Sequence, residues 1–114
     1  MKTVNLETDY EVAETDVILT VVVGDAQIGA SVVKLNTKTL GMGEIAKLLV
    51  GSGPKVRRKN LYIKTAVTDV NDSTDHTSLT YRLGGGKNDR EFISSATVDQ
   101  DGDSIVYRAK FHLV

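Results

Sequence analysis

The clearest pattern along this chain is an alternation of apolar and polar residues with a period of two. In the C-terminal segment 104–114, apolar residues at 105, 107, 109, 111 and 113 alternate with largely polar ones. Successive side chains of a β-strand point to opposite faces, so this segment is predicted to be a strand with one buried and one solvated face. The segment from Val17 to Val23 is apolar on both faces and rich in β-branched residues, which is typical of a central strand.

The same analysis predicts about seven strands in all. Turn signals such as Gly24-Asp25 and Asp101-Gly102 separate them. Short strands at this spacing, without alternating helices, predict a single all-β domain over residues 1–114. The expected architecture is an antiparallel β-sandwich, immunoglobulin-like or jelly-roll-like, and a partly open barrel is the alternative. The predicted strands span residues 3–12, 17–23, 28–35, 61–70, 79–83, 91–98 and 104–114.

One segment departs from the alternation. Residues 43–50 place Ile45, Leu48 and Leu49 at helical spacing, with glycines on both sides and Pro54 shortly after. Glycine and proline in these positions are typical of helix boundaries. The sequence therefore predicts one short helix at residues 43–50, which would cover an open end of the sheets because two turns are not stable alone.

Composition limits the classes of function. The chain has 114 residues, of which 40% are hydrophobic, and this suits one soluble globular domain. Cysteine is absent, which excludes disulfides, thiolate catalysis and cysteine-based metal sites. The first residues lack the apolar core of a signal peptide, and no apolar run approaches the roughly 20 residues of a membrane helix. We therefore expect no membrane association and favour a cytoplasmic location.

Acidic residues are predicted to gather at one end of the sandwich. If each strand runs opposite to the previous one, the connections near 24–27, 70–76 and 99–103 share an end that also includes Asp69 and carries no lysine or arginine. Carboxylates from neighbouring loops can converge on a calcium ion. An EF-hand is excluded, because the position of its bidentate glutamate is Lys110, but a site shared between loops is not. The candidate ligands are Asp25, Asp72, Asp75, Asp99, Asp101 and Asp103.

An alternative explains these aspartates without a metal, because Asp is a preferred turn residue whose side chain bonds local backbone amides. The opposite end is predicted to be mildly basic, and four cations there are candidates for contact with a polyanion or an acidic partner. A net charge of −1 and the small number of aromatic residues argue against nucleic acid. A solvated loop that discourages edge-to-edge aggregation is the other interpretation. The four cations are Lys55, Arg57, Arg58 and Lys59.

Signals of catalysis are weak. The segment from Gly41 to Ala46 matches a dinucleotide-binding pattern, but the βαβ context and the downstream acidic residue are missing. The two histidines, His76 and His112, are expected at different ends of the sandwich, and neither has an evident orienting partner. We therefore predict that the protein is not an enzyme and has no cofactor, with calcium as the one ion to test.

Contact with other proteins is the leading hypothesis for function. The terminal segments 3–12 and 104–114 are expected to be edge strands, and an open edge can pair with another chain. We predict a non-enzymatic module that acts through protein–protein contact or self-association, as an assembly subunit or adaptor. The alternative is a calcium- or ligand-binding module that uses the aspartate-rich loops.

Overall fold

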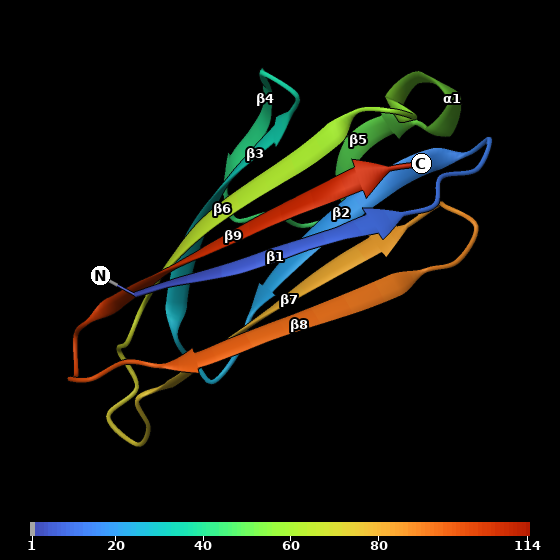
Figure 1. The fold of residues 1–114 in the computed structure, drawn as a ribbon. Coiled ribbons are helices and arrows are strands. Elements are labelled where there is room, and N and C mark those ends of the chain that lie inside the picture. The colour runs from blue at the N-terminus through green and yellow to red at the C-terminus, as the bar shows by residue number, and fades with distance from the viewer. Residues whose placement is uncertain (1) are drawn as a thin grey trace.

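Two β-sheets pack face to face, and Figure 1 shows their strands running along the long axis of the molecule. The computed structural model describes residues 2–114, so Met1, the first residue of the predicted domain, lies outside the described residues. The larger sheet has the strand order β1-β9-β6-β3-β4, and the smaller sheet has the order β5-β2-β7-β8. The strands are β1 (Lys2–Tyr10), β2 (Asp16–Val23), β3 (Ile28–Leu35), β4 (Lys38–Gly43), β5 (Leu48–Ser52), β6 (Asn60–Thr68), β7 (His76–Gly84), β8 (Arg90–Thr97) and β9 (Ser104–Leu113).

The alternation along the sequence marks the side chains that pack between the sheets. In β6, Leu61, Ile63, Thr65 and Val67 are buried, while the residues that alternate with them point to the outer face. Aromatic rings complete this core, with the centroids of Tyr81 and Phe111 5.7 Å apart in an edge-to-face contact. Burial of each large apolar side chain stabilises the fold by about 1.5–3 kcal/mol. All seven predicted strands are confirmed, and they correspond to β1, β2, β3, β6, β7, β8 and β9.

Consecutive strands run in opposite directions, as predicted. Every sheet pair is antiparallel except β1 with β9, which are parallel because both run in the same direction along the sandwich. The β6–β7 and β8–β9 connections therefore lie at the end that holds the N-terminus (Figure 1). The expectation of two terminal edge strands is half correct. β1 is an edge strand, whereas β9 lies between β1 and β6.

The predicted helix at residues 43–50 is wrong. This segment contains the end of β4, a bend that crosses between the sheets, and the start of β5, so the structure has nine strands rather than seven among residues 2–114. Gly43 and Lys47 have positive φ angles of 89° and 51°, which redirect the chain at both sides of the bend. Val50 is buried while Leu49 is 54% exposed, as expected for a strand. The helical spacing of Ile45, Leu48 and Leu49 spans the bend and the start of β5, and each of these pieces is too short to show a period of its own.

The helix that the structure does contain is shorter and lies just after this segment. It is α1 (Gly53–Val56), which has a proline in its first turn and connects β5 to β6. Pro54 fits there because the first amides of a helix have no intrahelical acceptor. No helix within residues 2–114 is long and apolar enough to cross a membrane.

Ile45 anchors the bend between β4 and β5. Its side chain is 4% exposed, and its carbonyl oxygen accepts a hydrogen bond from the Val21 amide at 2.9 Å. We predict that Ile45→Ala lowers the free energy of unfolding by about 2–5 kcal/mol, because it leaves a cavity in the core. Leu49→Ala is expected to change it by no more than about 0.5 kcal/mol. Chemical denaturation measures both values. Equal losses of unfolding free energy in the two variants would contradict the strand assignment. Such equal losses are what a helix with both side chains facing inward predicts.

Candidate metal centre

Three aspartates converge at the acidic end of the sandwich. Asp69, Asp75 and Asp101 each offer a carboxylate oxygen, and these three oxygens lie within 4.8 Å of one another. Asp69 directly follows β6, Asp75 directly precedes β7, and Asp101 lies in the β8–β9 connection. Two connections that are distant in the sequence therefore build one cluster.

The burial of Asp69 distinguishes this cluster from an ordinary group of surface acids. Asp69 is only 3% exposed, and neither of its carboxylate oxygens has a hydrogen-bond partner among the described residues. A buried carboxylate without a donor or a counter-charge is costly, because it loses its hydration and gains nothing in return. The neighbouring Asp75 and Asp101 carry the same charge, so their repulsion increases this free-energy cost unless a proton or a cation lies between the three groups.

Main-chain hydrogen bonds hold the two connections together around the cluster. The Asp69 amide donates to the Asp103 carbonyl at 2.9 Å, and the Gly102 amide donates to the Asp69 carbonyl at 3.1 Å. The Val98 amide donates to the Asp75 carbonyl at 2.9 Å. The backbone therefore positions the carboxylates without help from bonds between their side chains.

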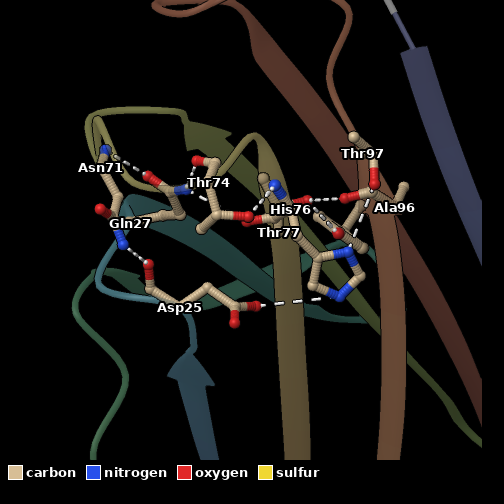
Figure 2. Close-up of polar contacts among 9 residues, drawn as sticks. Asp25, Gln27, Asn71, Thr74, His76, Thr77, Ala96 and Thr97 are labelled. Carbon is tan, nitrogen blue, oxygen red and sulfur yellow. Dashed lines mark hydrogen bonds and ion pairs between the residues drawn. The ribbon is translucent and has the colours of Figure 1, made fainter.

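Gln27 shapes the β6–β7 loop, and Figure 2 shows its side chain hydrogen-bonded to Asn71 and Thr74 of that loop. Its side chain is buried, and its Oε1 atom accepts hydrogen bonds from the amides of Val70 at 2.7 Å and Asn71 at 2.9 Å. Its Nε2 atom donates to the carbonyls of Thr74 at 3.3 Å and His76 at 3.1 Å. One side chain thus satisfies four main-chain groups of a single loop and fixes its path.

The cluster changes the acidity of one of its members. When Asp75 is protonated, it can share its proton first with the Asp101 carboxylate and then with that of Asp69, and this raises the pKa of the Asp75 carboxyl from 3.8 to about 6. Above this pH the three groups repel one another. The cluster is therefore a place where positive charge is favourable, whether a proton or a metal ion supplies it.

Of the six predicted ligands, the structure brings only Asp75 and Asp101 together. The other four have different surroundings: Asp25 lies 4.0 Å from the imidazole of His76, Asp99 lies 3.6 Å from the Lys2 ammonium, Asp103 accepts from the Gln100 amide at 3.2 Å, and Asp72 is exposed. The local bond of Asp103 is the turn chemistry that the alternative interpretation predicted.

Asp69 was not among the predicted ligands, although a signal for it exists in the sequence. The inward-facing residues of β6 are the odd-numbered ones, Leu61, Ile63, Thr65 and Val67. The next position in this series is Asp69. An acidic residue that continues the buried face of a strand into a loop points toward the interior, and this placement separates it from its exposed neighbours.

The other candidate residues do not form a comparable site. Lys55, Arg57, Arg58 and Lys59 are exposed in and after α1, at the opposite end of the sandwich, as predicted. The glycines of the segment from Gly41 to Ala46 belong to β4 instead of a loop before a helix, which removes the context that a dinucleotide site needs.

The histidines lie at opposite ends of the sandwich. His112 does have orienting partners, contrary to expectation, since its ring nitrogens lie 2.6 Å from Glu7 and 2.9 Å from Asn60. The hydrogen bond between His112 and Glu7, together with the charge of Lys110, lowers the pKa of Glu7 from its ordinary value of 4.5. His76 lies between Asp25 and the Thr97 hydroxyl.

Comparison of this chain with models of protein families, with curated protein sequences and with solved structures found no match. The chemistry of the cluster is therefore the guide to function. It offers only carboxylate oxygens, which are the ligands that hard cations such as calcium prefer.

The raised pKa of Asp75 predicts how the stability of the metal-free protein depends on pH. The pKa is 3.8 in the unfolded chain and about 6 in the folded one. The stabilisation from the shared proton is therefore fully present below pH 3.8 and is lost as the pH rises through about 6. We expect the stability of the wild type relative to Asp75→Asn to fall over this range, because the amide cannot ionise. Denaturation in a chelating buffer over this pH range measures the difference in free energy of unfolding between the wild type and Asp75→Asn. Asp72→Asn is the control variant. A difference that does not change with pH would contradict the raised pKa of Asp75.

Proposed function

We propose that this protein is a divalent-cation-binding β-sandwich module, that calcium is its ion, and that Asp69, Asp75 and Asp101 are the protein ligands. The observation that carries this proposal is the carboxylate of Asp69, which is buried, has no hydrogen-bond partner within residues 2–114 and belongs to a cluster of three carboxylates. A cation at the centre of the cluster would supply the missing counter-charge.

The dimensions of the cluster favour calcium. Calcium binds six to eight oxygens at roughly 2.3–2.6 Å, so two ligands on opposite sides of the ion lie up to about 5 Å apart. The three oxygens lie within 4.8 Å of one another, which satisfies this limit. Asp75 is half-buried and Asp101 is exposed, which leaves room for water to complete the shell. Zinc and copper are disfavoured because the cluster contains no histidine or cysteine.

A bound cation would join the β6–β7 loop to the β8–β9 connection. The main-chain bonds from Asp69 to residues 102 and 103 already align these segments. The ion would add direct bonds from both segments to one centre, so its expected effect is to stabilise this end of the sandwich. In this proposal the folded domain presents a loop surface whose order depends on calcium.

We predict that calcium raises the melting temperature of the chelator-treated wild type. At about 100 times the dissociation constant, a ligand adds roughly 2.7 kcal/mol, or on the order of 10 °C for a domain of this size. Asp69→Asn is expected to abolish this shift. The same variant is expected to melt higher than the wild type without calcium, because it removes a buried unpaired charge. Calorimetry measures the melting temperatures with and without calcium, and native mass spectrometry detects the bound ion.

The matched control is Asp72→Asn, which removes an exposed carboxylate from the same loop, outside the cluster. It is expected to keep the full shift with calcium. The proposal fails if the wild type shows no shift at about millimolar calcium, the weak end of protein calcium sites. It also fails if Asp69→Asn binds calcium as well as the wild type does.

Protein–protein contact is the second candidate function, and the free edge of β8 favours it. Among the described strands, this eight-residue strand pairs with β7 alone, and its Ile93 side chain is 70% exposed. An edge strand of this length, with one side unpaired and an exposed apolar residue, is a template for pairing with another chain. A second copy that adds its own β8 would extend the smaller sheet across the contact.

We predict that the wild type self-associates through this edge and that Ile93→Lys is monomeric, because lysine on an edge strand opposes pairing. Light scattering over a concentration series measures the molecular mass. Leu49→Lys on β5, the other edge of the same sheet, is the control and is expected to associate like the wild type. A wild type that stays monomeric at every concentration would exclude self-association.

A further inference from the structure

The outer face of the larger sheet carries four cations on three neighbouring strands. We call this the basic face, and its residues are Lys34 of β3, Lys64 of β6, and Arg108 and Lys110 of β9. The register places Lys64 directly opposite Arg108, and it places Tyr62 between Lys34 and Lys110. These side chains therefore form two adjacent rows across the centre of the sheet.

Three of the four cations of the basic face have no ion-pair partner among residues 2–114. Like charges directly opposite each other on neighbouring strands destabilise a sheet, so the Lys64–Arg108 pair does not help the fold. Among residues 2–114, none of the ion pairs includes Lys34, Lys64 or Arg108. Glu7 lies opposite Lys110, but its carboxylate is engaged by His112 at 2.6 Å. The basic face thus holds positive charge that the domain itself does not neutralise.

Apolar groups lie among these cations. Tyr62 is 38% exposed, and the Lys110 ammonium lies 5.7 Å from the centre of its ring. Val32 and Tyr62 line an open depression together with the side chains of Lys34, Lys64 and Arg108. Next to it, Met42 lies opposite Val32 and is 71% exposed. The face combines an apolar centre with surrounding charge, which is the usual arrangement of a protein interface.

We infer that the basic face binds an acidic segment of a partner protein, with carboxylates of the partner on Lys34, Lys64 and Arg108 and an apolar side chain in the depression beside Tyr62. Charge complementarity identifies the occupant as anionic. Single-stranded nucleic acid fits less well, because such sites stack several bases on aromatic rings. Tyr62 is the one exposed aromatic side chain among residues 2–114. The inference does not depend on the metal centre or on the β8 edge.

Fluorescence anisotropy tests this inference with two labelled probes, a peptide of alternating glutamate and leucine and an oligothymidylate of similar length. The wild type is expected to bind the peptide more tightly than the oligonucleotide at about 0.15 M salt. Lys64→Glu/Arg108→Glu is expected to weaken peptide binding by roughly tenfold or more, because attraction becomes repulsion at two positions. Lys47→Glu/Lys87→Glu makes the same change of net charge elsewhere and is expected to keep the affinity within about twofold.

Lys64→Glu alone separates binding from folding. It places opposite charges across β6 and β9, so its melting temperature is expected to equal or exceed that of the wild type while peptide binding falls. The inference is overturned if the wild type does not bind the peptide, if it binds the oligonucleotide more tightly, or if Lys64→Glu leaves the affinity unchanged. Self-association that competes with the peptide would assign the face to a second copy and would also overturn it.

Discussion

Strand β6 lies at the middle of the larger sheet, hydrogen-bonded to β3 on one side and to β9 on the other, and its side chains alternate between two environments. Leu61, Ile63 and Val67 fill the space between the sheets. A slip of one residue would send all of them to solvent, so their burial fixes the register of the strand. The same register directs Asp69 inward where the strand ends and leaves Lys64 on the outer face. One packing constraint therefore places a member of each candidate site.

The acidic end shows how a buried charge is held in place. Asp69 is positioned by main-chain bonds to residues 102 and 103, and the loop after it follows the hydrogen bonds of Gln27. None of these bonds uses the carboxylate, so the frame is complete while the charge remains uncompensated. A site whose ligands are held by the backbone loses little entropy when an ion arrives, which is the advantage of a preorganised centre.

Net charge alone conceals how this protein distributes its charge. The sum of −1 combines an acidic cluster at one end with a basic sheet face. Among residues 2–114, no ion pair includes the three aspartates of the cluster or the facing pair Lys64 and Arg108. Asp69 lies five residues beyond Lys64, which corresponds to about 16 Å along a strand. That distance is roughly twice the Debye length at physiological ionic strength. The two regions therefore act independently, so a cation at one end and an acidic partner on the sheet face are compatible on a single domain.

Alternation along the chain was enough to predict the seven longer strands, and the reversal of direction from each strand to the next predicted that the acidic loops gather at one end. The sequence by itself missed β4 and β5, where positive φ angles at Gly43 and Lys47 redirect a segment too short to show its period. Tertiary structure alone decided that Asp69, Asp75 and Asp101 converge, since long-range bonds from Gln27 and between the two connections set the loop paths. The tertiary structure also decided that Lys64 of β6 lies directly opposite Arg108 of β9. Alternation states which face a side chain occupies, whereas the order of strands in a sheet depends on pairing between distant segments.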